Sequence, residues 1–239
     1  MAYSKPTQIE SWSASRYFTY DQCPALAKFR YLDKIKEPGS EAMDRGTDIH
    51  KMAELYIKGH GRTIPKELTK FTDYFKDLRK NYKKVNHMMF IEDTWSYRND
   101  WSQTTYNDWS GCWLRVKLDC AYHDKELKTL YVDDFKTGKF RPEESSNYIM
   151  QLELYALAAL KRYPHLEEVR PRLVYLDTGD IYPPADAPLV FKRADVPSLE
   201  KIWAKRIKPM LTDKRFLPKP NNKCRWCFFC KENNGPCKF

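Results

Sequence analysis

An aspartate and a lysine, Asp134 and Lys136, follow an apolar run at residues 130–132 and precede a Thr-Gly pair at 137–138. Residues two apart on a strand point to the same face, so these opposite charges would share one side of a strand end. Asp119 ends another strand-like run fifteen positions earlier (134 − 119). Two carboxylates at neighbouring strand ends offer hard oxygen ligands to Mg²⁺, and a lysine beside them can orient or deprotonate a water. The pattern indicates metal-assisted hydrolysis of a phosphodiester.

Two helix-like segments carry further polar side chains at helical spacing. His50 lies one turn after Gly46 and one turn before Glu54, and Gln151 and Tyr155 are four residues apart, so each set shares a helix face. His50 would be an extra metal ligand, and imidazole suits Mn²⁺ at least as well as Mg²⁺. Gln151 and Tyr155 would reach the lysine, a metal-bound water or a phosphate. The alternative is that all these groups are ordinary structural or solvated polar residues, since acid-x-lysine pairs are common.

The rest of the sequence predicts the elements that would position these residues. Helices are predicted at 13–32, interrupted at Pro24, and at 41–58, 66–84, 146–163 and 197–212, and strands at 88–97, 112–122, 128–136, 172–177 and 189–193. A polar, aromatic stretch at 99–111 and a turn-rich stretch at 178–188 would be loops. This order predicts an α/β fold with a central mixed β-sheet flanked by helices. We expect one domain over 1–239, with a helical part at 1–85, a sheet core at 86–195, and a C-terminal helix with a cysteine-rich tail at 196–239.

The composition is that of a basic globular protein. Lys and Arg number 42 against 32 Asp and Glu, which gives a formal charge of +10, and 42% of the residues are apolar. A positive balance attracts nucleic acids, although many soluble proteins are basic for other reasons. The mean hydropathy is −0.75, and we find neither an apolar run of about 20 residues nor an apolar leader. These features predict a cytoplasmic protein without membrane contact. The lysine-rich face of helix 66–84 is interpreted as solvated rather than as a DNA contact.

Taken in order, the motifs resemble those of the RecB-like branch of the PD-(D/E)XK nucleases, which includes phage recombination exonucleases and CRISPR-associated adaptation nucleases. The resemblance covers about residues 13–156, and its motifs are Ser13-x-Ser15 with Cys23-Pro24, Gly46-x-x-x-His50, Asp119, Asp134-Phe135-Lys136-Thr137-Gly138 and Gln151-Leu152-x-x-Tyr155-Ala156. It implies a restriction-endonuclease-like core. The Asp-x-Lys register selects Asp134 rather than Asp133, and Lys117 stands where the family has a glycine.

The resemblance also implies a role for each matching residue. The implied metal ligands are His50, Asp119, Asp134 and the backbone carbonyl of Phe135; the implied catalytic residues are Asp119, Asp134 and Lys136, supported by Gln151 and Tyr155; contacts to DNA are expected from Ser13, Ser15, Arg16 and Lys139. The protein is therefore expected to be a Mg²⁺- or Mn²⁺-dependent deoxyribonuclease. We expect an exonuclease of recombination, repair or phage replication.

Seven cysteines without a secretory leader argue against a disulfide framework, and four of them lie within the last 16 residues. The spacing Cys224-x2-Cys227-x2-Cys230-x6-Cys237 could form a Cys₄ zinc site. Some RecB-like nucleases instead hold a [4Fe–4S] cluster with one cysteine before the core and three after it, and Cys23 stands where the first would be. That resemblance favours Cys224, Cys227 and Cys237 as tail ligands and leaves Cys230 spare. Cys112 and Cys120 are predicted to be core residues.

Two other function classes remain open. One is a nucleic-acid-binding module on a catalytically inactive nuclease scaffold, and the other is an adaptor built around a zinc tail. A phosphate-binding Gly-x-x-x-x-Gly-Lys-Ser/Thr motif is missing from the sequence, so a helicase activity would need a partner. The expected partners are DNA ends, a single-strand annealing or helicase protein, and further copies of the chain.

Overall fold

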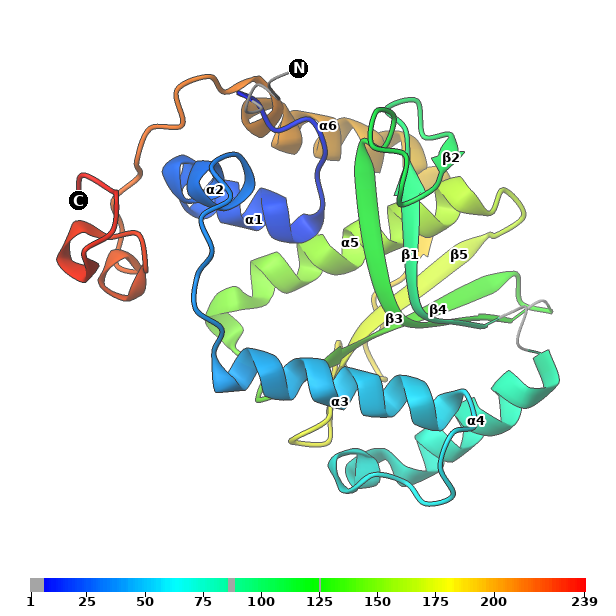
Figure 1. The fold of residues 1–239 in the computed structure, drawn as a ribbon. Helices are drawn as coiled ribbons and strands as arrows, with labels where there is room; N and C mark the ends of the chain where they lie inside the picture. The colour runs from blue at the N-terminus through cyan, green and yellow to red at the C-terminus, as the bar shows by residue number, and fades with distance from the viewer. Residues whose placement is uncertain (1–6, 86–88, 125) are drawn as a thin grey trace.

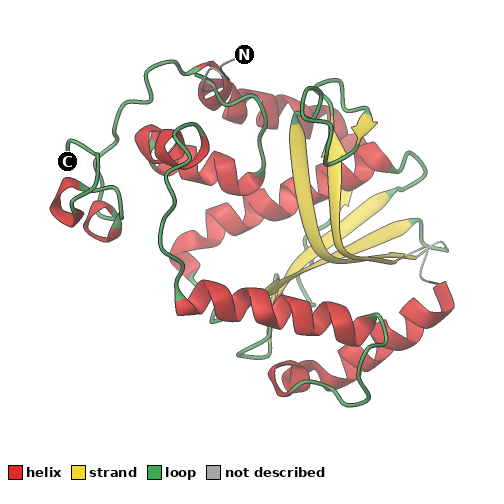
Figure 2. Cartoon of the chain, viewed as in Figure 1, coloured by secondary structure: helices red, strands yellow, loops and turns green. Residues whose placement is uncertain are grey.

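The computed structural model describes residues 7–85, 89–124 and 126–239, which form layers of helices around a seven-stranded mixed sheet (Figures 1 and 2). The sheet order is β2–β1–β3–β4–β5–β6, and β7 pairs with β5 beside β6. The β4–β5 pair is parallel and the other pairs are antiparallel. The strands are β1 (Met89–Tyr97), β2 (Gln103–Thr104), β3 (Leu114–Asp124), β4 (Thr129–Lys136), β5 (Glu168–Tyr175), β6 (Asp180–Tyr182) and β7 (Phe191–Lys192).

The helices lie on both sides of this sheet (Figure 1). They are α1 (Ala14–Gln22), α2 (Pro24–Tyr31), α3 (Glu41–Ile57), α4 (Thr72–Val85), α5 (Ser145–Arg162) and α6 (Val196–Thr212), and a 3₁₀ turn at Lys66–Phe71 precedes α4. Parallel strands need a crossover connection, and α5 supplies it between β4 and β5. The α/β class expected from the sequence, a central mixed sheet flanked by helices, is confirmed.

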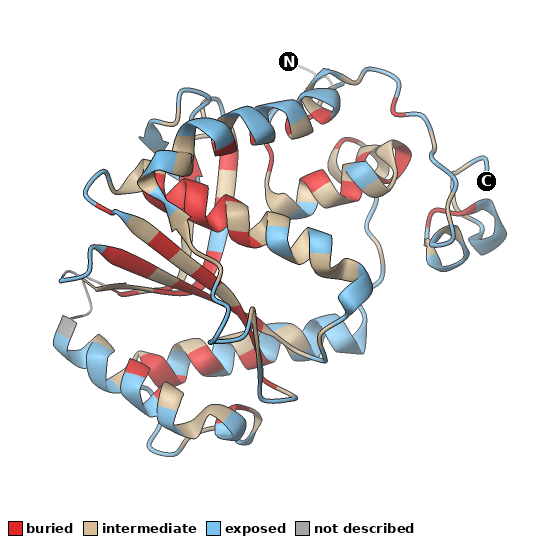
Figure 3. Cartoon of the chain, turned by 180° about the vertical axis from the view of Figure 1, so that it is seen from behind, coloured by how far each residue is buried: buried red, intermediate tan, exposed pale blue. Residues whose placement is uncertain are grey.

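Two hydrophobic clusters fix the helices to the sheet. The larger joins the sheet to α1, α5 and α6 and includes Trp12, Leu157 and Trp203. The smaller joins it to α3 and α4 through Ile49, Phe75 and the side chain of Phe135. Figure 3 shows the resulting alternation of buried and exposed positions along the helices. Cys112 and Cys120 are buried, as predicted.

The C-terminal segment after α6 runs back to α2 and contains only short 3₁₀ turns, at Cys224–Trp226 and Lys231–Asn233 (Figures 1 and 3). Lys219 Nζ donates to the backbone oxygen of Asp21 at 2.7 Å, at the end of α1. The rings of Phe29 and Phe229 lie 5.1 Å apart. These contacts connect the tail to the first two helices, about 200 residues earlier in the chain.

Several predicted boundaries are wrong. β5 begins at Glu168 rather than at 172, the 178–188 stretch contains β6, and the 99–111 stretch contains β2. Pro24 does divide the first helical segment, because it opens α2 directly after Cys23.

Arg79 is not part of a solvated face: its guanidinium donates to the backbone oxygens of residues 56, 59 and 61 and braces the end of α3. Within the described residues we find no helix with the length and apolar character that a membrane span requires.

Candidate active site

A cleft of about 870 Å³ opens between α3, the middle of β3, the end of β4 and the start of α5. Each of these elements presents polar side chains to it. The walls include His50 from α3, Asp119 from β3, Asp134 and Lys136 from β4, and Gln151 and Tyr155 from α5. The structure therefore brings together six residues that the sequence indicated separately.

Asp134 is the centre of the contacts at the end of β4. Its carboxylate lies 2.6 Å from Lys136 Nζ, and it accepts hydrogen bonds from Gln151 Nε2 at 3.0 Å and from the Tyr155 hydroxyl at 2.5 Å. Gln151 Oε1 in turn accepts from Lys136 Nζ at 3.3 Å. Gln151 and Tyr155, one turn apart on α5, thus both hold the Asp134 carboxylate, and Gln151 also holds Lys136.

Lys136 keeps its charge although its side chain is only 28% exposed. Burial alone lowers the pKa of an ammonium group, but the neighbouring Asp134, with a smaller contribution from Asp119, raises the pKa of Lys136 above its ordinary value. An ammonium that keeps its proton donates hydrogen bonds to a phosphate or a water and does not deprotonate one. The geometry thus favours orientation over general-base catalysis for this lysine.

Asp119 forms a second group with His50 and Glu92. His50 Nδ1 lies 3.2 Å from a carboxylate oxygen of Asp119 and 3.3 Å from one of Glu92. Burial lowers the pKa of His50, but hydrogen bonds to the two carboxylates outweigh it and raise this pKa to about 10. The other oxygen of Asp119 accepts the backbone N–H of Phe135 at 2.7 Å, which joins this group to β4. The pKa of Asp119 is raised by burial and by the nearby Asp134, so the two carboxylates repel each other unless a cation lies between them.

The ligand atoms of His50, Glu92 and Asp119 all lie within 4.8 Å of one another. One imidazole and two carboxylates make a donor set that suits Mg²⁺ or Mn²⁺. A divalent cation bound there would replace the proton that His50 carries between the acids.

Glu92 was not identified from the sequence. The pairing of Ile91 with Cys120 and of Asp93 with Leu118 places it opposite Asp119, and its φ of 52° is unusual for a strand residue. Its other oxygen lies 2.7 Å from Lys117 Nζ. The signal was an acid in the middle of a predicted strand, but only the register of β1 against β3 shows that it faces the cleft.

Asp133 lies on the opposite side of β4 from Asp134. It is fully buried and accepts hydrogen bonds from Arg172 on β5 and from the Tyr74 hydroxyl on α4. It therefore fixes the parallel β4–β5 pair instead of lining the cleft.

The predicted DNA contacts separate into two groups. Ser13 and Ser15 line the cleft, and the Ser13 hydroxyl also caps α1 by accepting the backbone N–H of Arg16 at 3.3 Å. Arg16 lines an adjacent hollow of about 490 Å³. Lys139 is exposed beyond the turn after β4 and is not among the residues that line the described cleft.

A scan against protein-family models matches the PD-(D/E)XK nuclease superfamily over residues 11–230. The chain belongs to this superfamily. Among solved structures, it resembles that of a candidate exonuclease from Eubacterium rectale, with 13% sequence identity, 97% of this chain and 91% of that chain covered, and a TM-score of 0.49. A search of curated proteins found no match. The PD-(D/E)XK assignment identifies the protein as a nuclease, a hydrolase that acts on phosphodiester bonds. Nucleases of this superfamily use divalent metal ions, and His50, Glu92 and Asp119 form a group that could hold one.

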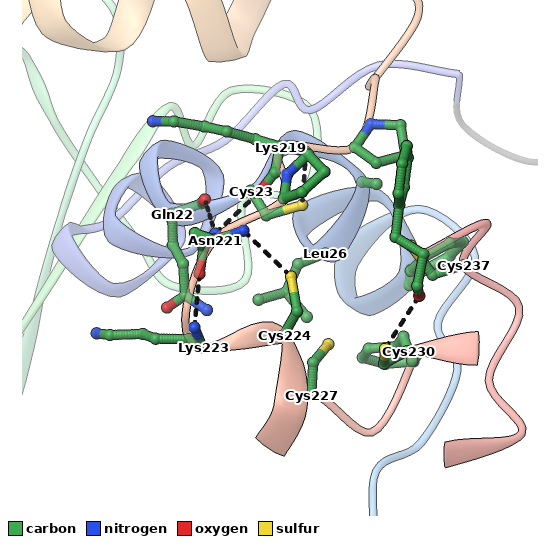
Figure 4. Close-up of a pocket in the computed structure, with 16 residues that line it drawn as sticks. Gln22, Cys23, Leu26, Lys219, Asn221, Lys223, Cys224, Cys227, Cys230 and Cys237 are labelled. Carbon is green, nitrogen blue, oxygen red and sulfur yellow. Dashed lines mark hydrogen bonds between the residues drawn. The ribbon is translucent and has the colours of Figure 1, made fainter. Parts of the chain in front are cut away.

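In this PD-(D/E)XK chain, five of the seven cysteines, Cys23 and the four of the tail, line a second, apolar pocket between α2 and the tail, also lined by Leu26, Phe29 and Phe229. Figure 4 shows the sulfurs of Cys23, Cys224 and Cys227 facing the same space. Burial raises the pKa of the Cys227 thiol, and so does the proximity of Cys224, Cys23 and Cys237. Cys230 differs, because its thiol donates to the backbone oxygen of Phe239 at 3.0 Å.

Proposed function

We propose that this nuclease is a Mg²⁺- or Mn²⁺-dependent deoxyribonuclease that digests DNA from an end, in recombination, repair or phage replication. One observation carries the proposal: Asp119, Asp134 and Lys136 meet in one cleft, with His50 and Glu92 beside them. A catalytically inactive scaffold would have no need of a buried, mutually repelling pair of carboxylates next to a charged lysine. Such an arrangement is costly unless a cation and a phosphate complete it.

The metal would be held by Asp119, Asp134, His50 and the backbone carbonyl of Phe135, and we add Glu92 to this set. The donor chemistry fits, because the oxygens are hard ligands and the imidazole extends the preference toward Mn²⁺. When bound, such a cation neutralises charge on the phosphate and lowers the pKa of a coordinated water. The raised pKa of Asp119 beside Asp134 supports a cation site between them.

The protein's own side chains would position the substrate. Lys136 would donate to a non-bridging oxygen of the scissile phosphate, because its raised pKa keeps it protonated. Gln151 would hold Lys136 and Asp134 in one orientation, and the Tyr155 hydroxyl would donate to the same Asp134 oxygen that accepts from Gln151. Ser13 and Ser15, at the start of α1, would contact the DNA backbone along with Arg16, and Lys139 would do so from outside the cleft.

We propose that the cysteine pocket binds a [4Fe–4S] cluster through Cys23, Cys224, Cys227 and Cys237, with Cys230 spare. Backbone amides of Lys219 and Asn221 donate to the sulfurs of Cys23 and Cys224 at 3.4 and 3.3 Å, as they do to cluster thiolates. Zinc with a Zn–S bond of about 2.3 Å would bring its thiolates to about 3.8 Å from one another. Among the described residues, no three cysteine sulfurs converge within 4.8 Å. A cluster, whose thiolates bind different irons, suits this wider arrangement better than zinc.

The deciding experiment uses linear and covalently closed circular DNA, each with Mg²⁺, Mn²⁺ or EDTA. An end-dependent nuclease degrades the linear form with either metal, spares the closed circle and is silent in EDTA. Cutting of the closed circle would replace the exonuclease proposal with an endonuclease. Binding without any cutting under all conditions would leave the inactive nucleic-acid-binding module.

We also propose a cytoplasmic site of action, with a single-strand annealing or helicase protein as partner and self-association into an oligomer. Sedimentation with and without DNA measures the self-association directly.

A further inference from the structure

The loop between β1 and β3 carries exposed aromatic rings at the edge of the cleft. Trp109 is 78% exposed and Tyr106 is 54% exposed. Tyr106 lines the active-site cleft, and Trp109 lines the adjoining hollow. Large exposed rings are uncommon without a binding role when they lie side by side, and these two are 6.3 Å apart, edge to face.

The loop is held in one shape from within. The Asp108 carboxylate accepts hydrogen bonds from Arg98 at 2.8 Å, from the Thr104 hydroxyl at 2.6 Å and from the Gly111 backbone N–H at 2.9 Å. A Cβ at Gly111 would lie 2.5 Å from an oxygen of this carboxylate, so a larger residue there would displace the Asp108 side chain. The loop therefore presents its rings from a preorganised frame, which reduces the entropy lost on binding.

Arg115 connects the rings to the active site. Its guanidinium lies 5.0 Å from the Tyr106 ring and 5.7 Å from the Trp109 ring, and it lines both the cleft and the adjoining hollow. Arg115 and Asp119 are four residues apart on β3, which is about 13 Å along a strand. A polynucleotide seated at Asp119 and extending along β3 would reach Arg115.

Two guanidinium groups meet at this point without an acid. Arg16 and Arg115 both donate to the Ser11 hydroxyl, at 2.6 and 3.3 Å. In the described part of the chain, no ion pair with a carboxylate includes either of them, and the buried Nε of Arg115 has no hydrogen-bond partner there. Burial and the nearby Arg115 lower the pKa of Arg16. A bound phosphate would relieve this repulsion.

We propose that Arg115 and Arg16 bind a backbone phosphate of single-stranded DNA, while Trp109 and Tyr106 stack against its unpaired bases. The inference rests on the proposed deoxyribonuclease function and names its substrate class as an unpaired strand. Stacking on an exposed indole needs a base with a free face, which a duplex offers only after unpairing. Lys117, the neighbouring cation on β3, is paired with Glu92 and does not take part.

The test is binding of fluorescent oligo-dT and of a blunt duplex of equal length, measured by anisotropy in EDTA so that nothing is cut. We expect Trp109→Ala to weaken oligo-dT binding about tenfold and to leave duplex binding unchanged, and Trp109→Phe to retain most of the affinity. Arg115→Ala should weaken binding and reduce the salt dependence by about one phosphate contact. Arg170→Ala is the matched control, because Arg170 also lies over a ring, that of Tyr131, but pairs with Glu168.

Oligo-dT affinities equal to wild type in Trp109→Ala and Arg115→Ala, with melting temperatures also unchanged, would overturn the inference. So would an equal loss for oligo-dT and duplex. The proposed function is measured separately, by cutting of any DNA with Mg²⁺ in the wild type. A wild type that cuts DNA while Trp109 has no effect on single-strand affinity removes this inference and retains the nuclease.

Discussion

At the scale of single residues, the cleft divides its polar groups between binding a cation and contacting the substrate. His50, Glu92 and Asp119 converge on one point, whereas Lys136, Gln151 and Tyr155 surround the carboxylate of Asp134. The division implies that variants of the two groups will fail in different ways. Metal affinity and turnover can therefore be separated experimentally.

Replacing Asp134 or Lys136 by Ala should reduce DNA cleavage by about 10³-fold, because each variant removes a group that meets the reacting phosphate or its metal. Mn²⁺ affinity, measured by calorimetry, should fall in Asp134→Ala and in Asp119→Ala but change little in Lys136→Ala, since an ammonium has no lone pair. Lys128→Ala is the control: this exposed lysine pairs with Glu167 on the surface. Wild-type cleavage by either Asp134→Ala or Lys136→Ala would mean that the catalytic centre lies elsewhere.

If the Glu92 carboxylate is a metal ligand, Glu92→Gln should weaken Mn²⁺ binding about tenfold. This loss is at the lower end of the losses of metal affinity that follow when groups around a metal site are altered. A second explanation is that Glu92 only neutralises Lys117, 2.7 Å away. The double variant Glu92→Gln/Lys117→Met separates the two. Recovery of wild-type affinity in the double variant would show that Glu92 acts through Lys117 and is not a ligand.

At the scale of elements, β4 carries opposite functions on its two sides. Asp134 faces the cleft, and the fully buried Asp133 forms an ion pair with the partly exposed Arg172 on β5 at 2.5 Å. The pairing fixes the parallel strands that place Asp134 and Lys136. Removing one partner of a buried pair leaves an uncompensated charge, which costs about 3–5 kcal/mol.

Arg172→Met should therefore lower the free energy of unfolding by about 3–5 kcal/mol, measured with urea. In Asp133→Asn/Arg172→Met, most of that loss should be recovered, because no charge remains buried. A double variant as unstable as the single one would show that the loss comes from packing of the Arg172 side chain over Tyr74.

A second link ties α3 to the turn after β5. Arg45 donates to the Asp177 carboxylate at 2.9 Å, and the backbone N–H of Gly138 donates to it at 2.6 Å. The hydrogen bonds from Arg45 and from the backbone N–H of Gly138 lower the pKa of Asp177, and they outweigh the opposite effect of partial burial. A lowered folded-state pKa means that the stabilisation is present above the unfolded pKa, near 3.9, and is lost as the pH falls through the folded value.

Asp177→Asn should thus cost about 1 kcal/mol at pH 7. The difference from wild type should shrink below about pH 4 and vanish at lower pH. Urea unfolding at pH 7, 4 and 2.5 measures this trend. A difference that persists at pH 2.5 would show that the carboxylate charge is not its cause.

Much of the element order and most of the cleft followed from the sequence, because strand-end charges and helical spacing report local geometry. Asp134 is close in the chain to Lys136, and Gln151 is close to Tyr155. Each pair shares a face because of the two-residue repeat of a strand or the near-four-residue repeat of a helix, so it could be predicted from the spacing alone. Glu92 and Arg115 could not be found in this way, since their roles depend on the register of β1 against β3 and on the path of a loop. Asp133 shows the same limit: its partners Tyr74 and Arg172 are 59 and 39 residues distant.

At the scale of the whole molecule, the chain returns its C-terminal end to its first helices. Lys219 and Asn221 bond to the backbone at residues 21 and 22, and the cysteine pocket lies where these segments meet. A cluster held by Cys23 and the tail would close a loop of about 200 residues. Closing so long a loop restricts the unfolded chain and stabilises the fold.

Protein purified without oxygen should therefore contain iron and sulfide and absorb broadly near 400 nm, as iron–sulfur clusters with thiolate ligands do. Cys23→Ser should lose the iron and lower the melting temperature of the whole protein, because the link between the two ends of the chain is lost. Cys112→Ser is the matched control, a buried cysteine outside the pocket. Stoichiometric zinc without iron in both wild type and Cys23→Ser would instead show a metal site confined to the tail. The active-site cleft shares no lining residue with the described cysteine pocket, so that result would leave the nuclease centre unchanged.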